Sequence, residues 1–372
     1  MSKCMKKELS ALELHFLVRE FQTLVGGRLD KAYQSDKDKL YLQMHITGQG
    51  KKVLHVRLPY AIYYEDTKPE VPSVPPHFCA YLRKKLGNAS LKGLYQYGFE
   101  RILVMDFQNK LGDFKLLIEL FDKGNAILCD NEWTVLSAIH YKKFRERVIR
   151  PNVKYQIPPA LPEPWTITFE KAKEIFEANE GKNLAKTLAS RFGLGGVYAE
   201  EVLYRGGVDK NQKEVSDEDI KRIVAELHKL REIKPEPIVL TENEILKGAF
   251  PFKVKDVKEH LEKNSFNDAV KDFMETFRED DKQEKQKNAK VQKQEQMIEK
   301  QEEMKQGFEK EIEENMKKGE LIYENYQLVE DIISQLRKAR ENLSWKEIKE
   351  RLKDHKYVKE IDEKNNAFVI EL

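Results

Sequence analysis

Basic and aromatic side chains alternate in the stretch 141–154, YKKFRERVIRPNVK, which makes it a first candidate for chemistry. Cations neutralise the phosphates of nucleic acids, and rings such as those of Tyr141 and Phe144 can stack on unpaired bases. The stretch holds a single acid, Glu146. The cations that we expect to contact an RNA backbone are Lys142, Lys143, Arg145, Arg147 and Arg150. A solvated basic surface would explain the cluster equally well.

A second basic cluster, Arg83, Lys84 and Lys85, ends a stretch with helical spacing, FCAYLRKKLG, which follows the proline-rich segment 68–78. Its lysines and arginine also suit an RNA backbone. As with the first cluster, a solvated surface is the competing interpretation.

A glycine-rich turn, FGLGGV at 192–197, joins two expected helices. This is the pattern of a helix-hairpin-helix turn, in which glycines allow close approach and backbone N–H groups at the next helix receive a phosphate. We therefore name Gly193 and Gly195 as candidate RNA-backbone contacts. A tight helix connection that binds nothing is equally compatible.

Catalytic chemistry has little support in the sequence. The eight histidines lie apart without metal-ligand spacing, and no phosphate-binding loop or nucleophile elbow is present. Cys4, Cys79 and Cys129 are scattered, so neither a disulfide framework nor a zinc site is indicated. We expect no metal, no cofactor and no intrinsic enzymatic activity.

Composition limits the partners and the compartment. The net charge is only +2, so any affinity for nucleic acid must come from local patches. The N-terminus does not read as a signal peptide, and no apolar run is long enough to span a membrane. We therefore expect a cytoplasmic protein without a membrane partner.

The elements that would position these residues indicate an α+β chain in four parts. Residues 1–160 combine a capped helix from Ser10 with antiparallel strands at 29–34, 40–46, 52–58, 61–66, 101–108, 114–121 and 125–130. Residues 161–236 form a helical domain with helices at 169–178, 184–192, 198–204 and 217–230. Residues 237–343 hold a connector and an arm, and 344–372 begin a further domain, with a helix from Ser344 and a terminal strand that lacks a partner. That last strand suggests the front part of a longer protein.

The arm is predicted as a long antiparallel α-helical coiled coil that turns near Gly319. Its return limb repeats apolar residues with heptad spacing. These residues are Ile322, Tyr326, Val329, Ile333, Leu336 and Leu343. The outgoing limb has a thinner series, Val291, Ile298, Met304, Phe308, Ile312 and Met316. An exposed seam of this kind could also support self-association.

Several blocks together resemble the NFACT family: LVGGRLDKAYQ at 24–34, PPHFCAYLRK at 75–84, ELFDKGNAILCD at 119–130, GLGGVYAEEVLYRGGVD at 193–209 and GELIYENYQLVEDI at 319–332. Their order matches the front part of that family across nearly the whole chain. The resemblance implies an N-terminal domain similar to that of formamidopyrimidine-type DNA glycosylases. Since the chain begins Met1-Ser2-Lys3, the proline nucleophile of those enzymes is missing.

The resemblance also implies a function in ribosome-associated quality control. Family members bind large ribosomal subunits obstructed by peptidyl-tRNA and recruit aminoacyl-tRNA, typically alanyl-tRNA, for template-free extension of the stalled chain. The ribosome performs the peptidyl transfer, while the factor binds and positions. The alternative is a coiled-coil scaffold that binds ribosomes or a protein partner without engaging tRNA.

The tRNA-contacting pair implied by the family is an Asp-Arg dipeptide, and the matching positions here are Glu100 and Arg101. Glu100 keeps the charge but moves it outward by about one methylene. Arg101 can still make a forked contact with a phosphate or a base edge. We expect tRNA contacts from Glu100, Arg101 and the basic cluster at Arg83, Lys84 and Lys85. An internal Glu–Arg ion pair is the alternative.

Overall fold

A computed structural model describes residues 8–67, 70–144, 147–158, 161–179, 183–212, 214–243, 245–255, 257, 259–353, 355–362, 365 and 367–372. Within it, side chains are described except at 277–296, 299 and 300. The chain divides into a first unit, Met1–Asp280, and a second unit, Asp281–Leu372.

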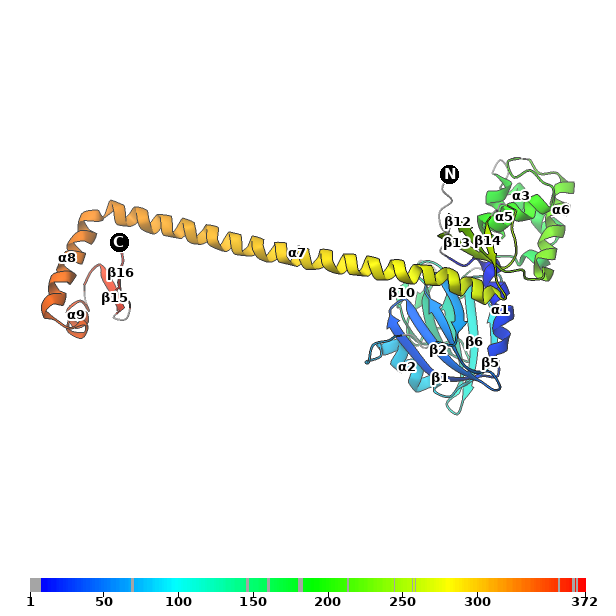
Figure 1. The fold of residues 1–372 in the computed structure, drawn as a ribbon, viewed down its shortest axis with the longest axis horizontal. Helices are drawn as coiled ribbons and strands as arrows, with labels where there is room; N and C mark the ends of the chain where they lie inside the picture. Colours follow the sequence, from blue (N-terminus) through cyan, green and yellow to red (C-terminus); the bar gives the residue numbers. More distant parts are fainter. Residues whose placement is uncertain are drawn as a thin grey trace. The chain divides into compact units, whose positions relative to one another are not determined.

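The first unit contains a nine-stranded antiparallel sheet in the order β4-β3-β2-β1-β5-β6-β7-β8-β9 (Figure 1). Its strands are β1 (Arg28–Asp36), β2 (Lys39–Ile46), β3 (Gly50–Arg57), β4 (Ala61–Glu65), β5 (Ser90–Gln96), β6 (Ile102–Asn109), β7 (Gly112–Glu119), β8 (Asn125–Asp130) and β9 (Val135–Ala138). The predicted strands are confirmed, but β5 and β9 were not predicted. In β5 a register shift near Gly93 places the buried residues Leu91 and Leu94 three positions apart, which hides the alternation.

Apolar side chains alternate between the two faces of this sheet. Along β6, Leu103 and Met105 belong to a large core, whereas Ile102 and Val104 belong to a smaller core on the opposite face. The large core also takes in helices α1 (Ala11–Phe21) and α2 (His77–Leu86). The predicted capping box of α1 is present: Glu13 donates its N–H to Ser10 Oγ at 3.2 Å, and Ser10 donates to Glu13 Oε2 at 2.8 Å.

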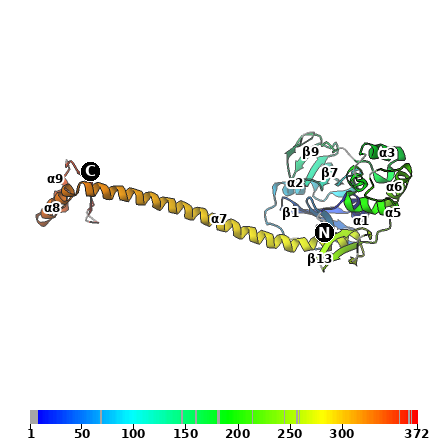
Figure 2. The same ribbon diagram turned by 90° about the horizontal axis from the view of Figure 1, so that it is seen from above.

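Four predicted helices follow, and all are confirmed: α3 (Phe169–Glu177), α4 (Leu184–Arg191), α5 (Gly195–Arg205) and α6 (Asp217–Lys229). Short 3₁₀ turns lie at Gln22–Leu24, Pro164–Thr166 and Leu230–Glu232. Figure 2 shows α3, α5 and α6 grouped beside α1, away from α2. Their apolar residues join the same large core as the sheet.

The segment predicted as a connector contains a small sheet. Its strands are β12 (Ile238–Glu242), β13 (Ile245–Phe250) and β14 (His260–Glu262), in the order β13-β12-β14. A two-stranded ladder of β10 (Lys142–Lys143) and β11 (Val148–Ile149) was also not predicted. Strands this short give too few residues for a period to show.

Helix α7 (Phe266–Glu324) begins within the first unit, where other elements complete its first turn. Glu20 accepts the backbone N–H of Phe266 at 2.7 Å and that of Asn267 at 2.8 Å. The Asn267 side chain bonds both backbone groups of Tyr64 in β4, and Arg57 donates to the carbonyl of Met274 at 2.9 Å. A carboxylate from α1 thus caps α7, because the first N–H groups of a helix have no partner within it.

The predicted turn near Gly319 is wrong, because α7 continues through this glycine to Glu324. Helix-forming residues flank Gly319, and a single glycine costs a helix only about 1 kcal/mol. The break comes at Asn325, whose side chain donates to the carbonyl of Leu321 at 2.9 Å. Helix α8 (Tyr326–Asn342) follows. None of the described helices is long and apolar enough to cross a membrane.

The predicted antiparallel coiled coil is not formed by α7 and α8. Met304, Phe308 and Ile312 on α7 are 58–60% exposed, whereas α8 buries Ile332 and Leu336 in a small core of the second unit. That core includes α9 (Trp345–Arg351), β15 (Val358–Asp362) and β16 (Ala367–Ile370). Over five turns, a heptad seam and an amphipathic stripe of period 3.6 look alike.

The end of the second unit corrects one expectation and confirms another. The predicted terminal strand is present as β16, and it pairs with β15 rather than lacking a partner. The predicted helix from Ser344 is capped as expected, with Ser344 Oγ accepting the N–H of Glu347 at 3.4 Å. The helix ends at Arg351, three residues before the predicted end near Asp354.

Candidate nucleic-acid interface

Glu100 and Arg101 lie in a tight turn between β5 and β6. The turn is closed by the N–H of Tyr97, which donates to Ile102 O at 2.9 Å, and Gly98 supplies a positive φ of 52°. The side chain of Gln96 donates to the carbonyls of both Ala11 and Glu100, each at 2.9 Å. These bonds fix the turn against the start of α1.

The two side chains of this turn bind different neighbours. The Glu100 carboxylate accepts the N–H of Leu161 at 3.0 Å, and burial raises its pKa despite that bond. Arg101 donates to Glu8 Oε2 at 2.6 Å and to Leu9 O at 3.4 Å. The Arg101 side chain is still 28% exposed. Glu100 is thus a positioning group, whereas Arg101 keeps access to solvent.

The predicted glycine turn lies beside the Glu100–Arg101 turn. A Cβ at Gly193 would approach Leu161 Cδ1 to 3.0 Å and Phe99 Cδ1 to 3.3 Å, so a side chain there would have to push these neighbours aside. Gly193 and Gly195 have φ values of 68° and 74°, which favour glycine. The structure therefore brings together two of the predicted sites, although Arg101 and Gly193 are 92 residues apart in the sequence. The α5 start has no side-chain cap.

A buried contact between α1 and α5, which the sequence did not reveal, fixes this arrangement. Tyr198 donates its hydroxyl to Glu13 Oε1 at 2.6 Å, and Glu13 is only 1% exposed. Burial, followed by the Glu13 charge, raises the pKa of Tyr198. Since Glu13 also completes the cap of α1, one carboxylate holds the helix start and the helical domain together.

The burial of His15, on the same helix, predicts that the stability of the fold depends on pH. Its Nε2 is buried and has no hydrogen-bond partner among the described residues, and burial followed by Arg19 and Arg231 lowers its pKa to about 4. The unfolded chain therefore binds a proton between pH 6.5 and about 4 that the folded chain does not. We expect acidification across this window to lower the free energy of unfolding by about 3 kcal/mol.

The measurement is urea denaturation at several pH values for wild type and His15→Phe. The variant should lose the part of the pH dependence that falls between pH 6.5 and 4. Equal slopes for both proteins would show that His15 is not the titrating group.

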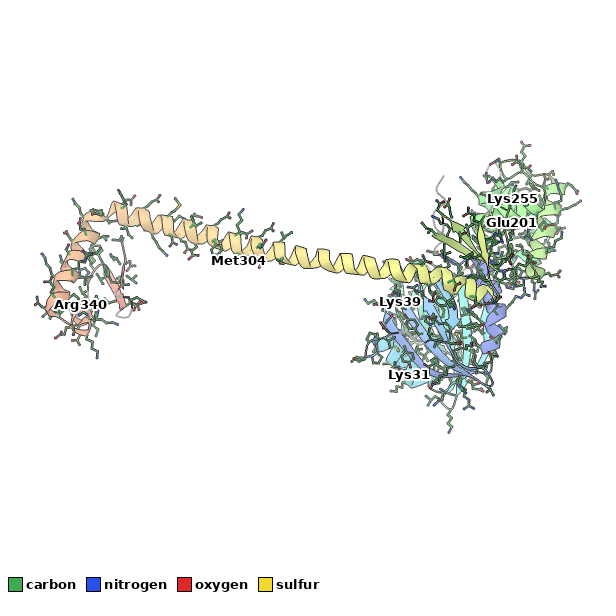
Figure 3. The ribbon with its side chains drawn as sticks, in the orientation of Figure 1. Lys31, Lys39, Glu201, Lys255, Met304 and Arg340 are labelled. Atoms are coloured by element: carbon green, nitrogen blue, oxygen red, sulfur yellow. The ribbon has the colours of Figure 1, made fainter. Side chains whose placement is uncertain are left out.

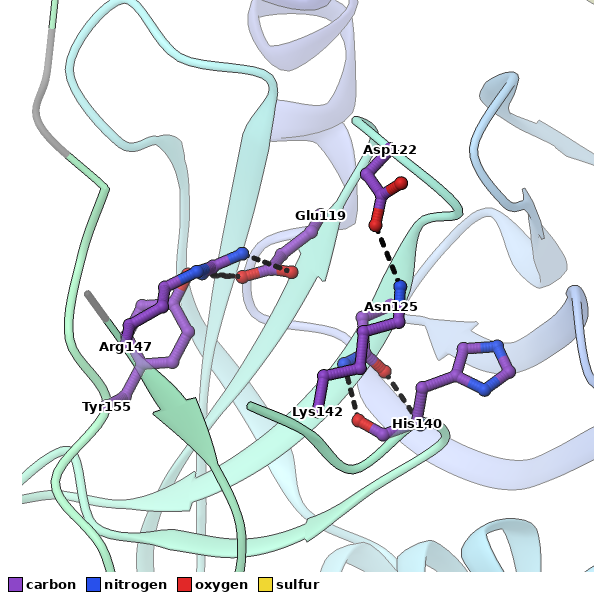
Figure 4. Close-up of polar contacts among 7 residues, drawn as sticks. All are labelled: Glu119, Asp122, Asn125, His140, Lys142, Arg147 and Tyr155. Carbon is purple, nitrogen blue, oxygen red and sulfur yellow. Dashed lines mark hydrogen bonds and ion pairs between the residues drawn. The ribbon is translucent and has the colours of Figure 1, made fainter. Parts of the chain in front are cut away.

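Two cations of the basic stretch at 141–154, Arg147 and Lys142, are held by acids (Figure 4). Arg147 makes a forked contact with Glu119, at 2.6 Å and 3.3 Å, and Tyr155 donates to the same carboxylate at 2.7 Å. Glu119 and Arg147 are 3% and 11% exposed. The guanidinium also lies over the rings of Phe121 and Phe144. Arg147 is thus placed inside the fold rather than on the open basic surface suggested by the sequence.

Of the other cations in this stretch, some are paired with an acid and some are exposed. Lys142 pairs with Asp122 at 2.8 Å, and Asn125 clamps the backbone of His140 through two hydrogen bonds (Figure 4). Lys143 and Arg150 are exposed. The predicted contact by Arg145 lies outside the described residues. RNA contact by this stretch remains a prediction for Lys143 and Arg150.

The basic cluster at Arg83, Lys84 and Lys85 lies on α2, away from Arg101. Asn109, the last residue of β6, donates to the carbonyl of Lys85 at 2.8 Å, whereas Arg101 precedes the first residue of that strand. A strand of this length separates the two by about 25 Å. Arg83 donates to Ala32 O at 2.7 Å, and Lys84 is exposed. The two predicted tRNA contacts are therefore not one patch.

These features suit binding and positioning. Arg101 offers a charged fork at the edge of a rigid turn, and the adjacent glycine turn presents backbone N–H groups at the start of α5. Among the described residues, no group of three or more His, Cys, Asp or Glu side chains could hold a metal ion.

Comparison with known proteins adds a family match. Residues 10–367 match the family described as NFACT N-terminal and middle domains. The archaeal Rqc2 homolog aRqcH of Methanocaldococcus jannaschii is 35% identical over 373 residues, covering 95% of this chain and 55% of that protein. The human ribosome quality control complex subunit NEMF is 26% identical over 382 residues, covering 92% of this chain and 35% of NEMF. The chain thus spans about half or less of these relatives.

Two solved structures share the fold over about 70% of this chain. The fibrinogen binding protein from Staphylococcus aureus has a TM-score of 0.60 at 20% identity, over 70% of this chain and 97% of that one. The N-terminal part of the fibronectin/fibrinogen-binding protein from Streptococcus suis has a TM-score of 0.59 at 23% identity, over 72% and 100%. At such identities the likeness shows the fold alone.

Proposed function

Because this chain belongs to the NFACT family, we propose that it acts in ribosome-associated quality control in the cytoplasm. In this proposal it binds large ribosomal subunits obstructed by peptidyl-tRNA and recruits aminoacyl-tRNA, with alanyl-tRNA as the expected form, for template-free extension of the stalled chain. One relative is named a ribosome quality control complex subunit, and the other is named an Rqc2 homolog. The ribosome would supply the peptidyl-transfer chemistry, so the chain itself would not be an enzyme.

The observation that carries the proposal is the position of Arg101. Its turn is fixed by Gln96 and Glu100, its guanidinium remains partly exposed, and the Gly193 turn lies next to it. A cation on a fixed turn can bind a phosphate without a large ordering cost. This geometry favours a binding and positioning factor for tRNA.

The test is co-sedimentation of the chain with large subunits, with and without peptidyl-tRNA, in the presence of labelled alanyl-tRNA. We expect obstructed subunits to retain both the chain and the labelled tRNA, and empty subunits to retain less of each. Retention of the chain without any gain in labelled tRNA would reject tRNA recruitment.

A second candidate function is a scaffold that binds ribosomes or another protein without engaging tRNA. The exposed apolar side chains of α7, among them Met304, Phe308 and Ile312, favour it, because such a stripe can bind a partner helix. Met304 is labelled on this helix in Figure 3. The same stripe would permit self-association, which sedimentation at several protein concentrations would detect.

A further inference from the structure

We propose that the RNA-binding face extends from Arg101 across the turns that follow β1, β3 and β7, where Lys37 and Lys123 contact the backbone, and Tyr60 an unpaired base, of the same RNA. This inference rests on the proposed function, since it assigns further residues to the same tRNA site. These turns are far apart in the sequence, and we expect them to bind one RNA together.

Hydrogen bonds connect these turns into a continuous surface. Leu58 donates its N–H to Asp38 O at 2.8 Å, which joins the β3–β4 turn to the β1–β2 turn. Leu9 donates its N–H to Tyr60 O at 2.9 Å, and its carbonyl accepts from Arg101. Leu9 therefore links the β3–β4 turn to the Arg101 side chain. Lys39, labelled in Figure 3, begins β2 directly after the β1–β2 turn.

The β7–β8 turn packs against this group. A Cβ at Gly124 would lie 2.7 Å from Leu58 Cβ and 3.0 Å from Pro59 Cα, so the two turns touch with no space for a side chain. Leu120, at the start of the β7–β8 turn, donates its N–H to Arg101 O at 2.8 Å. This bond joins the turn to the Arg101 backbone. The surface is therefore built on backbone contacts and is rigid before any ligand arrives.

Cations gather on this surface. Lys37 and Lys123 are exposed. Burial lowers the pKa of His140, and the nearby charges of Lys142, Lys37 and Lys123 lower it further. His140 is held in place through its backbone by Asn125 (Figure 4). Asp38 and Asp122 also lie here, and Asp122 is neutralised by Lys142. Lys37 and Lys123 are thus the cations best placed for phosphates.

The surface also offers an aromatic ring. Tyr60 is 39% exposed at the tip of the β3–β4 turn, between Leu9 and the Lys123 turn. A ring on a turn that packs against the Lys37 and Lys123 turns suits single-stranded RNA, in which an unpaired base can stack while nearby phosphates are neutralised. This combination favours a hairpin loop of the RNA over a continuous duplex, whose bases are covered.

The test compares tRNA binding over a salt series for the full chain as wild type, Arg101→Ala, Lys37→Ala/Lys123→Ala and Tyr60→Ala. The matched control is Lys346→Ala/Lys349→Ala, which removes two exposed lysines from α9 in the second unit. An isolated RNA hairpin and a blunt duplex of equal length serve as further probes. Thermal unfolding of each variant verifies its fold.

We expect the Lys37/Lys123 variant to bind tRNA about tenfold more weakly at moderate salt and to lower the slope of log K against log salt by about 1 to 2. Tyr60→Ala should weaken hairpin binding while leaving duplex binding unchanged. The control should match wild type.

The outcomes separate this inference from the function on which it rests. Loss of affinity in Arg101→Ala, with Lys37→Ala/Lys123→Ala equal to wild type, would overturn the extended face and leave tRNA recognition in place. Absence of tRNA binding by the wild-type chain would overturn both. Equal losses in the lysine variant and in the control would show a general charge effect and overturn the inference.

Discussion

Replacing Arg101 with alanine is expected to weaken tRNA binding between about tenfold and a hundredfold, because charge-assisted hydrogen bonds contribute about 1.5–3 kcal/mol. In the free protein the guanidinium is bound to Glu8 at 2.6 Å, and Glu8 is 44% exposed. A phosphate would have to displace this carboxylate. Glu8→Gln should therefore strengthen binding about two- to fivefold, since the competing ion pair is exposed and weak.

Filter binding or fluorescence anisotropy with labelled tRNA measures both changes. Arg101→Lys serves as the matched variant, because it keeps the charge and loses the planar fork, and it should fall between wild type and alanine. Unchanged affinity in Arg101→Ala would remove Arg101 from the site. Weaker binding in Glu8→Gln would show that Glu8 orients Arg101 for the ligand rather than competing with it.

Breaking the Glu119–Arg147 pair is expected to cost the most stability. Glu119→Gln would leave the guanidinium of Arg147, only 11% exposed, without a counter-charge and weaken the acceptor for Tyr155. Removing one partner of a buried ion pair costs about 3–5 kcal/mol, whereas replacing both partners with apolar groups often restores stability. Glu119→Leu/Arg147→Met should therefore be more stable than Glu119→Gln.

Urea denaturation of the three proteins tests this prediction. The matched control is Asp122→Asn, which breaks the exposed pair with Lys142 and should change the free energy of unfolding by less than about 1 kcal/mol. If Glu119→Gln and Asp122→Asn had equal effects, the Glu119–Arg147 pair would be an ordinary surface contact. A double variant less stable than Glu119→Gln would mean that the charges stabilise the fold.

Local signals in the sequence predicted the elements better than they predicted the contacts between them. The capping boxes at Ser10 and Ser344 are read from residues three apart, and both are present. The partners of Arg101 and Arg147 are 93 and 28 residues away. The spacing of residues in the sequence does not reveal pairs this far apart. An arginine in a basic stretch therefore appears unpaired in the sequence, whether or not a carboxylate contacts it in the fold.

The arm shows the same limit for packing. The apolar spacing of α8 correctly indicated one buried face, but spacing cannot say what covers that face. Here a small sheet and α9 cover it, through Ile348, Val358 and Ile361. A turn between α4 and α5 could be predicted because positive φ is a local requirement, which Gly193 and Gly195 meet, whereas phosphate contact by this turn stays a prediction.

The cap that Glu20 gives to α7 determines where the chain can be cut. An N-terminal fragment that stopped before Phe266 would leave a partly buried carboxylate, whose pKa burial already raises, without its two N–H donors. It would also expose the edge of β4 that Asn267 covers. A stable fragment must therefore run past Met274, well into a helix that composition alone would assign to the following segment.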